Sequence, residues 1–260
     1  MTTMLLAIDV GNTETVVGLL DGTTIVHHWR VATEARRTAD EIMVLLRGLF
    51  GGSDAVDGIA VCSTVPAVQR EMRRLIQRYY DAVPSLLVEP GVRTGVPVLM
   101  DNPREVGTDR IVNSLAATHL YGGRPCIVVD FGTATTFDVV SAQGEYLGGA
   151  IAPGIEVSLE ALGKAGAQLR RVEHVRPRSV IAKNTVEALQ SGSLYGFSGQ
   201  VDSIVTRMAA ELGVGLDGLT VIATGGLAPL VLDESATIHE HEPWLTLIGL
   251  RLVFDRNHPE

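Results

Sequence analysis

Apolar residues along this chain form two kinds of pattern, short continuous runs and longer stretches with helical spacing. Runs of about four to eight apolar residues bounded by turn residues are typical of buried strands. They predict strands over residues 5–9, 15–20, 24–31, 58–63, 85–88, 124–130, 136–140, 145–151 and 219–223. Apolar positions three and four apart predict helices over residues 41–50, 66–80, 109–121, 153–162, 185–212 and 245–257. Because strands and helices are interleaved, the predicted fold class is α/β.

The strand and turn at the start of the chain recur in its middle. Asp9-Val10-Gly11-Asn12 is matched 121 positions later by Asp130-Phe131-Gly132-Thr133. In both places a strand carries an aspartate to a glycine turn and a hairpin follows, with Thr15 matched by Thr136. A pattern repeated with the same spacing and turns indicates a duplicated unit. We therefore expect two related α/β domains, over residues 1–117 and 118–260.

Composition and charge argue against several classes of protein. The chain of 260 residues carries 21 Lys and Arg against 30 Asp and Glu, and this formal charge of −9 disfavours nucleic-acid binding. No run of 18 apolar residues predicts a membrane span, and the first residues lack the basic segment and cleavage site of a signal peptide. Cys62 and Cys126 lie in apolar runs, as buried thiols of a reducing compartment do, so we expect a cytoplasmic protein.

The two repeated turns have the chemistry of phosphate-binding sites. A glycine lets the backbone approach a phosphate closely, and nearby hydroxyl and amide side chains add hydrogen-bond donors. An aspartate at the carboxyl end of the strand, Asp9 or Asp130, can hold Mg²⁺ directly or through water. One such turn alone is more often an ordinary β-turn with an Asx cap, but two in matching positions favour a nucleotide phosphate. Thr224-Gly225-Gly226, also after a strand, is either a further turn or the contact to adenosine.

A third segment, Val106-Gly107-Thr108-Asp109-Arg110, offers a proton acceptor. An aspartate at a helix start is often only an N-cap. Beside it, however, Arg110 can clamp a carboxylate with two hydrogen bonds, and Gly107 lets a ligand come close. The segment therefore suits a site that binds an anionic substrate and removes the proton of its hydroxyl group.

Other motifs of the sequence do not point to a site. A P-loop is excluded because Gly163-Lys164 is followed by Ala165. Residues 213–218 match G-x-G-x-x-G, but they follow a predicted helix and precede a predicted strand, so we interpret them as a connecting loop. We interpret His239-Glu240-His241 as solvated surface rather than as a metal site.

Four segments together resemble type III pantothenate kinases, in that family's order and over essentially the whole chain. They are Leu6-Ala7-Ile8-Asp9-Val10-Gly11-Asn12-Thr13, Asp101-Asn102-Pro103 with the following residues 106–110, Asp130-Phe131-Gly132-Thr133-Ala134-Thr135, and Gly148-Gly149-Ala150-Ile151-Ala152-Pro153-Gly154. The resemblance implies duplicated ribonuclease H-like domains of the actin-like ATPase type around a nucleotide cleft. It also implies a homodimer that transfers the γ-phosphate of ATP to the 4′-hydroxyl of pantothenate, the first step of coenzyme A synthesis.

The resemblance also implies roles for residues that match the family's motifs. The first phosphate loop for ATP, with Asp9 near Mg²⁺, would be formed by Asp9, Val10, Gly11, Asn12, Thr13, Glu14, Thr15 and Val16. The pantothenate site would be formed by Gly107, Thr108, Asp109, Arg110 and, near the dimer interface, Thr185. Asp109 would accept the proton, Asp130 would bind a monovalent cation (K⁺ or NH₄⁺), and Thr133 would contact ATP. Gly225 and Gly226 are the expected adenosine contacts. Met100 stands where the family often has tyrosine, so that hydroxyl contact is missing.

Three other interpretations of the sequence stay open. A kinase of the same superfamily for a sugar or for acetate would share the phosphate turns, but Arg110 beside the proton acceptor favours an acidic substrate. A non-catalytic regulatory relative is expected to have eroded phosphate turns, and both turns are intact here. An actin-like polymer would need insertions, for which 260 residues leave little room.

Overall fold

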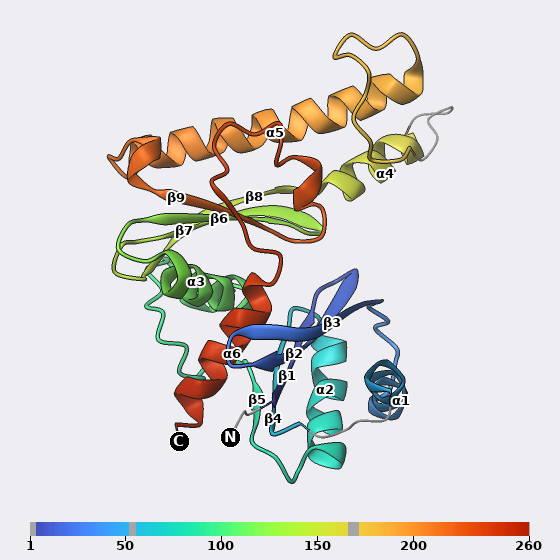
Figure 1. The fold of residues 1–260 in the computed structure, drawn as a ribbon, viewed down its shortest axis with the longest axis vertical. Coiled ribbons are helices and arrows are strands. Elements are labelled where there is room, and N and C mark those ends of the chain that lie inside the picture. The colour runs from blue at the N-terminus through green and yellow to red at the C-terminus, as the bar shows by residue number, and fades with distance from the viewer. Residues whose placement is uncertain (1–3, 52–55, 166–171, 260) are drawn as a thin grey trace. The chain divides into compact units, whose positions relative to one another are not determined.

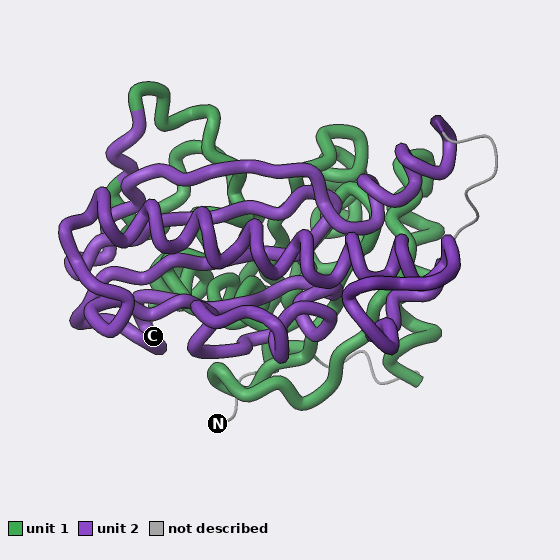
Figure 2. Tube along the Cα trace, turned by 90° about the horizontal axis from the view of Figure 1, so that it is seen from above, with its two compact units in different colours: residues 1–97, 101–116, 244–260 green, residues 98–100, 117–243 purple. Residues whose placement is uncertain are grey.

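The computed structural model describes residues 4–51, 56–165 and 172–259, and the chain divides into two compact units. Unit 1 contains residues 1–97, 101–116 and 244–260, and unit 2 contains residues 98–100 and 117–243 (Figure 2). Each unit has its own five-stranded sheet with helices packed on it, which confirms the α/β class. Over the ranges described, no helix combines the length and the apolar character needed to span a bilayer.

Unit 1 is built on a mixed sheet with the strand order β3-β2-β1-β4-β5 (Figure 1). The strands are β1 (Met4–Val10), β2 (Glu14–Asp21), β3 (Thr24–Ala32), β4 (Gly58–Ser63) and β5 (Ser85–Leu87). β1 pairs antiparallel with β2 and parallel with β4. Asp9 therefore lies in register with Cys62, and both residues are at the carboxyl ends of their strands.

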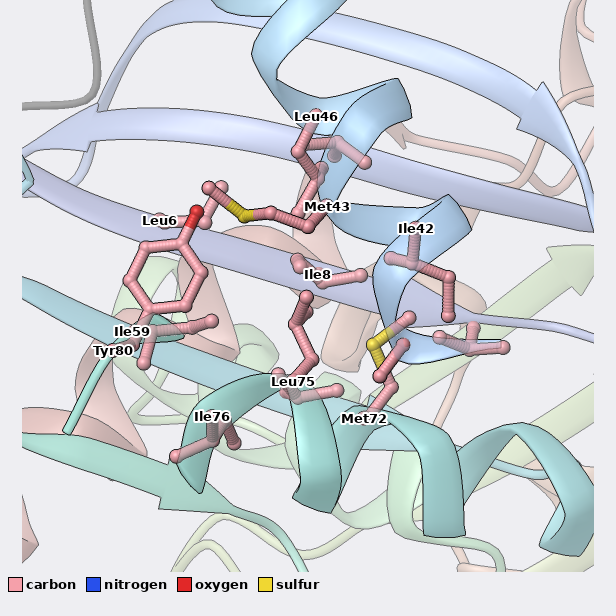
Figure 3. Packing of buried hydrophobic residues seen from close by; sticks show 14 of the residues in the cluster. Leu6, Ile8, Ile42, Met43, Leu46, Ile59, Met72, Leu75, Ile76 and Tyr80 are labelled. Carbon is pink, nitrogen blue, oxygen red and sulfur yellow. The ribbon is translucent and has the colours of Figure 1, made fainter. Parts of the chain in front are cut away.

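One face of this sheet is covered by α1 (Ala39–Phe50) and α2 (Pro66–Tyr79). α1 begins with a capping box, because the Thr38 side chain accepts from the Glu41 N–H while the Thr38 N–H donates to the Glu41 carboxylate. It ends at Gly51 in the left-handed conformation, as the sequence predicts. The core between helices and sheet includes Leu6, Ile8, Ile42, Met43, Leu46, Ile59, Met72 and Leu75 (Figure 3).

The other face of the sheet of unit 1 is covered by α6 (Leu245–Asn257). Phe254 lies so close to β4 that a Cβ atom at Gly58 would overlap its ring. α6 also packs on the first part of α3 (Thr108–Tyr121), where Gly249 meets the Val112 carbonyl. A helix from the last part of the sequence thus belongs to unit 1, which differs from the predicted division of the chain at residue 117.

Unit 2 repeats this plan with the strand order β10-β9-β6-β7-β8. Its strands are β6 (Cys126–Phe131), β7 (Ala134–Val140), β8 (Tyr146–Pro153), β9 (Thr220–Thr224) and β10 (Glu240–His241). One face of the sheet is covered by α4 (Ile155–Ala165) and the long α5 (Thr185–Glu211) (Figure 1). Short 3₁₀ turns lie at η1 (Pro103–Glu105), η2 (Leu216–Gly218) and η3 (Ala228–Leu230).

The matching topologies of the two sheets confirm the duplication predicted from the sequence. In chain order, β1 to β5 correspond to β6 to β10, and the equivalent pairs have the same direction. The second turn is one residue shorter, because Asp9 pairs with Val16 whereas Asp130 pairs with Thr136. Thr15 consequently corresponds to Thr135, and its predicted match with Thr136 is wrong by one position.

Candidate active site

In unit 1 the candidate site is built around the turn that follows β1. The Gly11 N–H donates to the Glu14 carbonyl over 3.0 Å, which closes the turn between β1 and β2. Asn12, Thr13 and Glu14 have exposed side chains, as a loop that meets a ligand requires. The Glu14 carboxylate forms an ion pair with Arg30 at 3.0 Å.

Asp9 is the electrostatically unusual residue of this turn. The pKa of its carboxyl group is raised from 3.8 to about 7, mainly by burial and also by the negative charge of Asp109. A hydrogen bond from the Cys62 thiol, 3.1 Å from Asp9 Oδ1, and the charge of Arg30 act in the opposite direction. A carboxylate that is costly to ionise and lies near a second carboxylate is well suited to accept a cation.

Asp109 lies in the first turn of α3, and the sequence predicts it there. A Cβ atom at Gly107 would lie 2.4 Å from Asp109 Oδ1, so a larger residue there would displace the carboxylate. The next residue, Thr108, has a buried hydroxyl oxygen with no hydrogen-bond partner among the residues that the structure describes. Since buried polar groups are nearly always satisfied, this hydroxyl indicates a place for a ligand atom.

In unit 2 the equivalent turn follows β6, and three glycines surround it. The Gly132 N–H donates to the Ala134 carbonyl over 3.0 Å, as Gly11 does to Glu14. Gly154 donates to the Thr133 carbonyl over 3.1 Å, and a Cβ atom on Gly154 would lie 2.3 Å from that oxygen. The exposed Thr133 therefore sits at the tip of a tightly packed turn.

Gly225 brings the third predicted segment to this turn. Its φ of +89° is in the left-handed region, and a Cβ atom there would lie 2.4 Å from Asp130 Oδ1. The two constraints together leave only glycine at this position. The structure thus places Asp130 and Gly225 in contact, with Gly226 exposed beside them.

Thr185 occupies a different part of unit 2. It is the first residue of α5, whose N-cap Asn184 accepts a hydrogen bond from the Glu187 N–H over 2.9 Å. Thr185 is exposed and lies in the sequence between two exposed apolar segments, Val180-Ile181 and Val186. These apolar side chains suit a surface that another protein chain covers.

A separate cavity of about 180 Å³ lies between α4, α5 and residues 229–234. The ion pair between Arg176 and Glu234, at 2.6 Å, lies at its wall. Its lining residues, all within the described ranges, include none of the residues predicted from the sequence as site residues.

The structure adds one residue that sequence reasoning missed, Cys62, whose apolar run predicts only a buried strand. Cys62 lies in register with Asp9, and Thr224, which the sequence places in the turn segment with Gly225 and Gly226, lies in register with Asp130. These pairings follow from parallel strands, which no local motif of the sequence signals. His239-Glu240-His241 is exposed as predicted, and the described residues contain no group of three His, Cys, Asp or Glu placed to hold a metal.

Comparison with solved structures defines the class of protein. A Baf-family protein of Campylobacter jejuni, described as a transcriptional activator, matches with a TM-score of 0.62 at 17% identity over 98% of this chain and 100% of that chain. A glucokinase of the ROK family from Streptomyces griseus, in complex with glucose and AMPPNP, matches with a TM-score of 0.52 at 13% identity over 99% and 100%. The fold is therefore that of the actin-like ATPases and ROK sugar kinases, with duplicated ribonuclease H-like domains, as predicted.

Comparison with sequences identifies the family. The model of the type III pantothenate kinase family matches residues 5–207. Proteins named type III pantothenate kinase from Streptomyces avermitilis and Thermobifida fusca are 67% and 64% identical to this chain. The first alignment covers 98% of both chains, and the second covers 98% of this chain and 100% of its relative. The chain belongs to the type III pantothenate kinase family.

Proposed function

We propose that this chain transfers the γ-phosphate of ATP to the 4′-hydroxyl of pantothenate, the first step of coenzyme A synthesis. The observation that carries the proposal is the near full-length match to proteins named for this activity, at 62% to 67% identity. The site is consistent with it, because Asp109, the proposed proton acceptor, lies close enough to Asp9 of the proposed phosphate loop to raise the pKa of its carboxyl group.

Each predicted residue has a task in the proposed reaction. Phosphoryl transfer depends mainly on positioning and on neutralising charge. Asp109 orients the 4′-hydroxyl group and takes its proton as the new bond forms. Arg110 holds the carboxylate of pantothenate, and Thr108 supplies a hydroxyl that has no partner among the described residues. The ATP contacts are assigned to residues 9–16, Thr133, Gly225 and Gly226.

The residues of the site fit the two cations that the family implies. Mg²⁺ commonly takes one or two carboxylates and completes its shell with water and phosphate oxygens, and Asp9 is a carboxylate that gains from such a charge. Mg²⁺ bound there would neutralise the phosphates of ATP. K⁺ or NH₄⁺ would be held by the oxygen donors near Asp130, which lies in register with the hydroxyl-bearing Thr224.

We also propose a homodimer and a cytoplasmic location. The exposed apolar residues Val180, Ile181 and Val186 flank Thr185, and a second copy of the chain would cover them. This arrangement would bring the predicted pantothenate contact Thr185 to the subunit interface. The location follows from the two unpaired, buried cysteines, Cys62 and Cys126.

The test of the function is an ADP-release assay with purified protein, ATP and Mg²⁺. Pantothenate is compared with a panel of sugars and with acetate, each with and without K⁺. We expect ADP release with pantothenate alone, and an increase on adding K⁺. Release with a sugar or acetate but not with pantothenate would contradict the proposal. Asp130→Ala should remove the response to K⁺, and a response that persists would reject the cation role.

A further inference from the structure

Cys62 is a buried thiol that the proposed reaction does not use. It is 0% exposed and is the second-to-last residue of β4. Its Sγ lies 3.1 Å from Asp9 Oδ1. The thiol donates and the carboxylate accepts. Because the hydrogen bond occupies Oδ1, it fixes the rotation of the carboxyl group and thereby the direction of Oδ2.

The fold builds this contact from the pairing of two strands. β1 and β4 run parallel with Asp9 opposite Cys62, so the two side chains point to the same face of the sheet. This is the face away from the core of α1 and α2, since the neighbouring Ile8, Val10 and Val61 belong to that core. Asp109 lies near enough on this face to raise the pKa values of both Asp9 and Cys62.

The second half of the molecule has a hydroxyl-bearing residue at the equivalent strand position. β6 and β9 run parallel with Asp130 opposite Thr224, which is 2% exposed. Cys62 and Thr224 therefore occupy equivalent positions in the duplicated fold, and each carries one donor on a short side chain. Both halves thus carry a hydrogen-bond donor beside the motif aspartate. A residue that served only to pack against apolar neighbours would not need a donor.

We propose that Cys62 is a positioning residue that orients the Asp9 carboxylate toward the divalent cation of bound ATP. The proposal rests on the function proposed above for Asp9. A thiol is a weak donor, so it holds the carboxyl group in place while withdrawing little of its negative charge. Partners of this kind, which touch a metal ligand rather than the metal, commonly change metal affinity when they are removed.

The experiment measures Mn²⁺ binding to the protein in the presence of ADP, from the electron paramagnetic resonance signal of free Mn²⁺. The variants are Cys62→Ala, which removes the donor, and Cys62→Ser, which keeps one. Cys62→Val keeps the volume without a donor and replaces Cys62→Ala if that variant fails to fold. The matched control is Cys126→Ala, because Cys126 is also buried, in unit 2, and its Sγ donates to the backbone carbonyls of Tyr121 and Arg124 at 3.7 Å.

We expect Cys62→Ala to weaken Mn²⁺ binding by about 3- to 10-fold, the range for loss of one hydrogen bond to a ligand. Cys62→Ser should stay within about twofold of the parent protein, as should Cys126→Ala. In the ADP-release assay the Mg²⁺ concentration for half-maximal rate should rise by the same factor as the Mn²⁺ dissociation constant, with KM for pantothenate unchanged.

Two results would overturn this proposal alone, and a third would overturn it together with the role of Asp9. One is unchanged Mn²⁺ affinity in Cys62→Ala or Cys62→Val while Asp9→Asn loses it. The other is an equal loss in Cys62→Ala and Cys126→Ala, which would indicate general loosening of the fold. Normal Mn²⁺ binding by Asp9→Asn would reject the role of Asp9 and this proposal together. Because Mn²⁺ binding does not depend on the phosphate acceptor, these outcomes hold whether or not pantothenate is the substrate.

Discussion

Asp9 and Asp109 carry chemically identical side chains in different surroundings, and the proposed function gives each a different task. Asp9 ends a strand, carries a pKa raised to about 7 and accepts a hydrogen bond from a thiol. Asp109 lies in the first turn of α3, and its carboxylate packs closely against Gly107. A cation at Asp9 would relieve the repulsion between the two carboxylates. Asp109 would then be left to act on the acceptor hydroxyl.

Asp109→Asn removes the proton acceptor without changing the size of the side chain. We expect kcat to fall by about 10²- to 10⁴-fold, the usual contribution of a general base, with KM for ATP nearly unchanged. Steady-state assays at varied ATP and pantothenate measure both constants. Asp81→Asn, which changes an exposed carboxylate of the same unit, is the control and should leave kcat as it is. A kcat that survives in Asp109→Asn would show that another group takes the proton.

The raised pKa of Asp9 predicts how the reaction responds to pH and Mg²⁺ together. Asp9 must be ionised to hold a cation, so at low Mg²⁺ the rate should fall as the pH drops below about 7. Mg²⁺ binds the ionised form, so raising its concentration should move this acidic limb to lower pH. Profiles of kcat/KM for ATP between pH 5 and pH 9, at several Mg²⁺ concentrations, provide the measurement. A limb that stays in place at all Mg²⁺ concentrations would contradict the assignment of this titration to Asp9.

At the scale of elements, two strand–turn–strand motifs repeat in the chain, and the proposed ATP contacts lie in and around them. Each carries an aspartate at the end of the central strand of its sheet and closes its turn with a glycine N–H. In unit 2 the turn after β9 packs closely on the end of β6, because Gly225 lies against Asp130 and the backbone of Phe131. The predicted ATP contacts of unit 2 thus depend on the backbone shape of two adjacent turns.

Gly225→Ala tests this dependence. Alanine at φ +89° is strained, and its Cβ would displace Asp130, so we expect kcat/KM for ATP to fall by about 10- to 100-fold. KM for pantothenate should change less. The matched control is Gly215→Ala, at a position with φ −76° and no atom within 4 Å of the added Cβ, and it should retain activity. Equal losses in the two variants would contradict the assignment of Gly225 to the ATP site.

Most elements could be predicted from sequence because their apolar runs are long and their ends are marked. β4 and α6 have the predicted bounds, and Gly51 ends α1 where expected. β10 was missed because it has only two residues, both exposed, and is held by pairing with β9. α4 begins at Ile155 rather than at residue 153, since Pro153 still pairs with Ala134 in the sheet.

The candidate site could be predicted only where its residues form local motifs. Gly107, Asp109 and Gly225 stand in short patterns whose chemistry can be read directly. Cys62 becomes part of the site only through the pairing of β1 with β4, which joins distant stretches of chain. The register of Thr224 with Asp130 is likewise seen only in the paired strands. The predicted match of Thr15 with Thr136, which is wrong by one position, has the same origin. The length of each turn becomes known only from the strand register.

At the scale of the whole molecule, exposed apolar residues at the start of α5 predict association. Ile181 is 82% exposed, and a large apolar side chain in water costs free energy that a partner surface recovers. Ile181→Asp places a charge there and should convert the proposed dimer to a monomer, measured by size-exclusion chromatography with light scattering. Val44→Asp is the control, because Val44 is 72% exposed on α1 of unit 1. A parent protein that is monomeric at micromolar concentration would contradict the proposed dimer.

The position of α6 has a consequence for how this protein comes into being. The helix that seals the second face of the sheet of unit 1 is encoded after all of unit 2. During synthesis, the face of this sheet that carries the buried Leu5 and Ala7 stays incompletely covered until residues 245–257 have left the ribosome. All of unit 2 is therefore synthesised before unit 1 can complete its fold, and unit 2 can fold first.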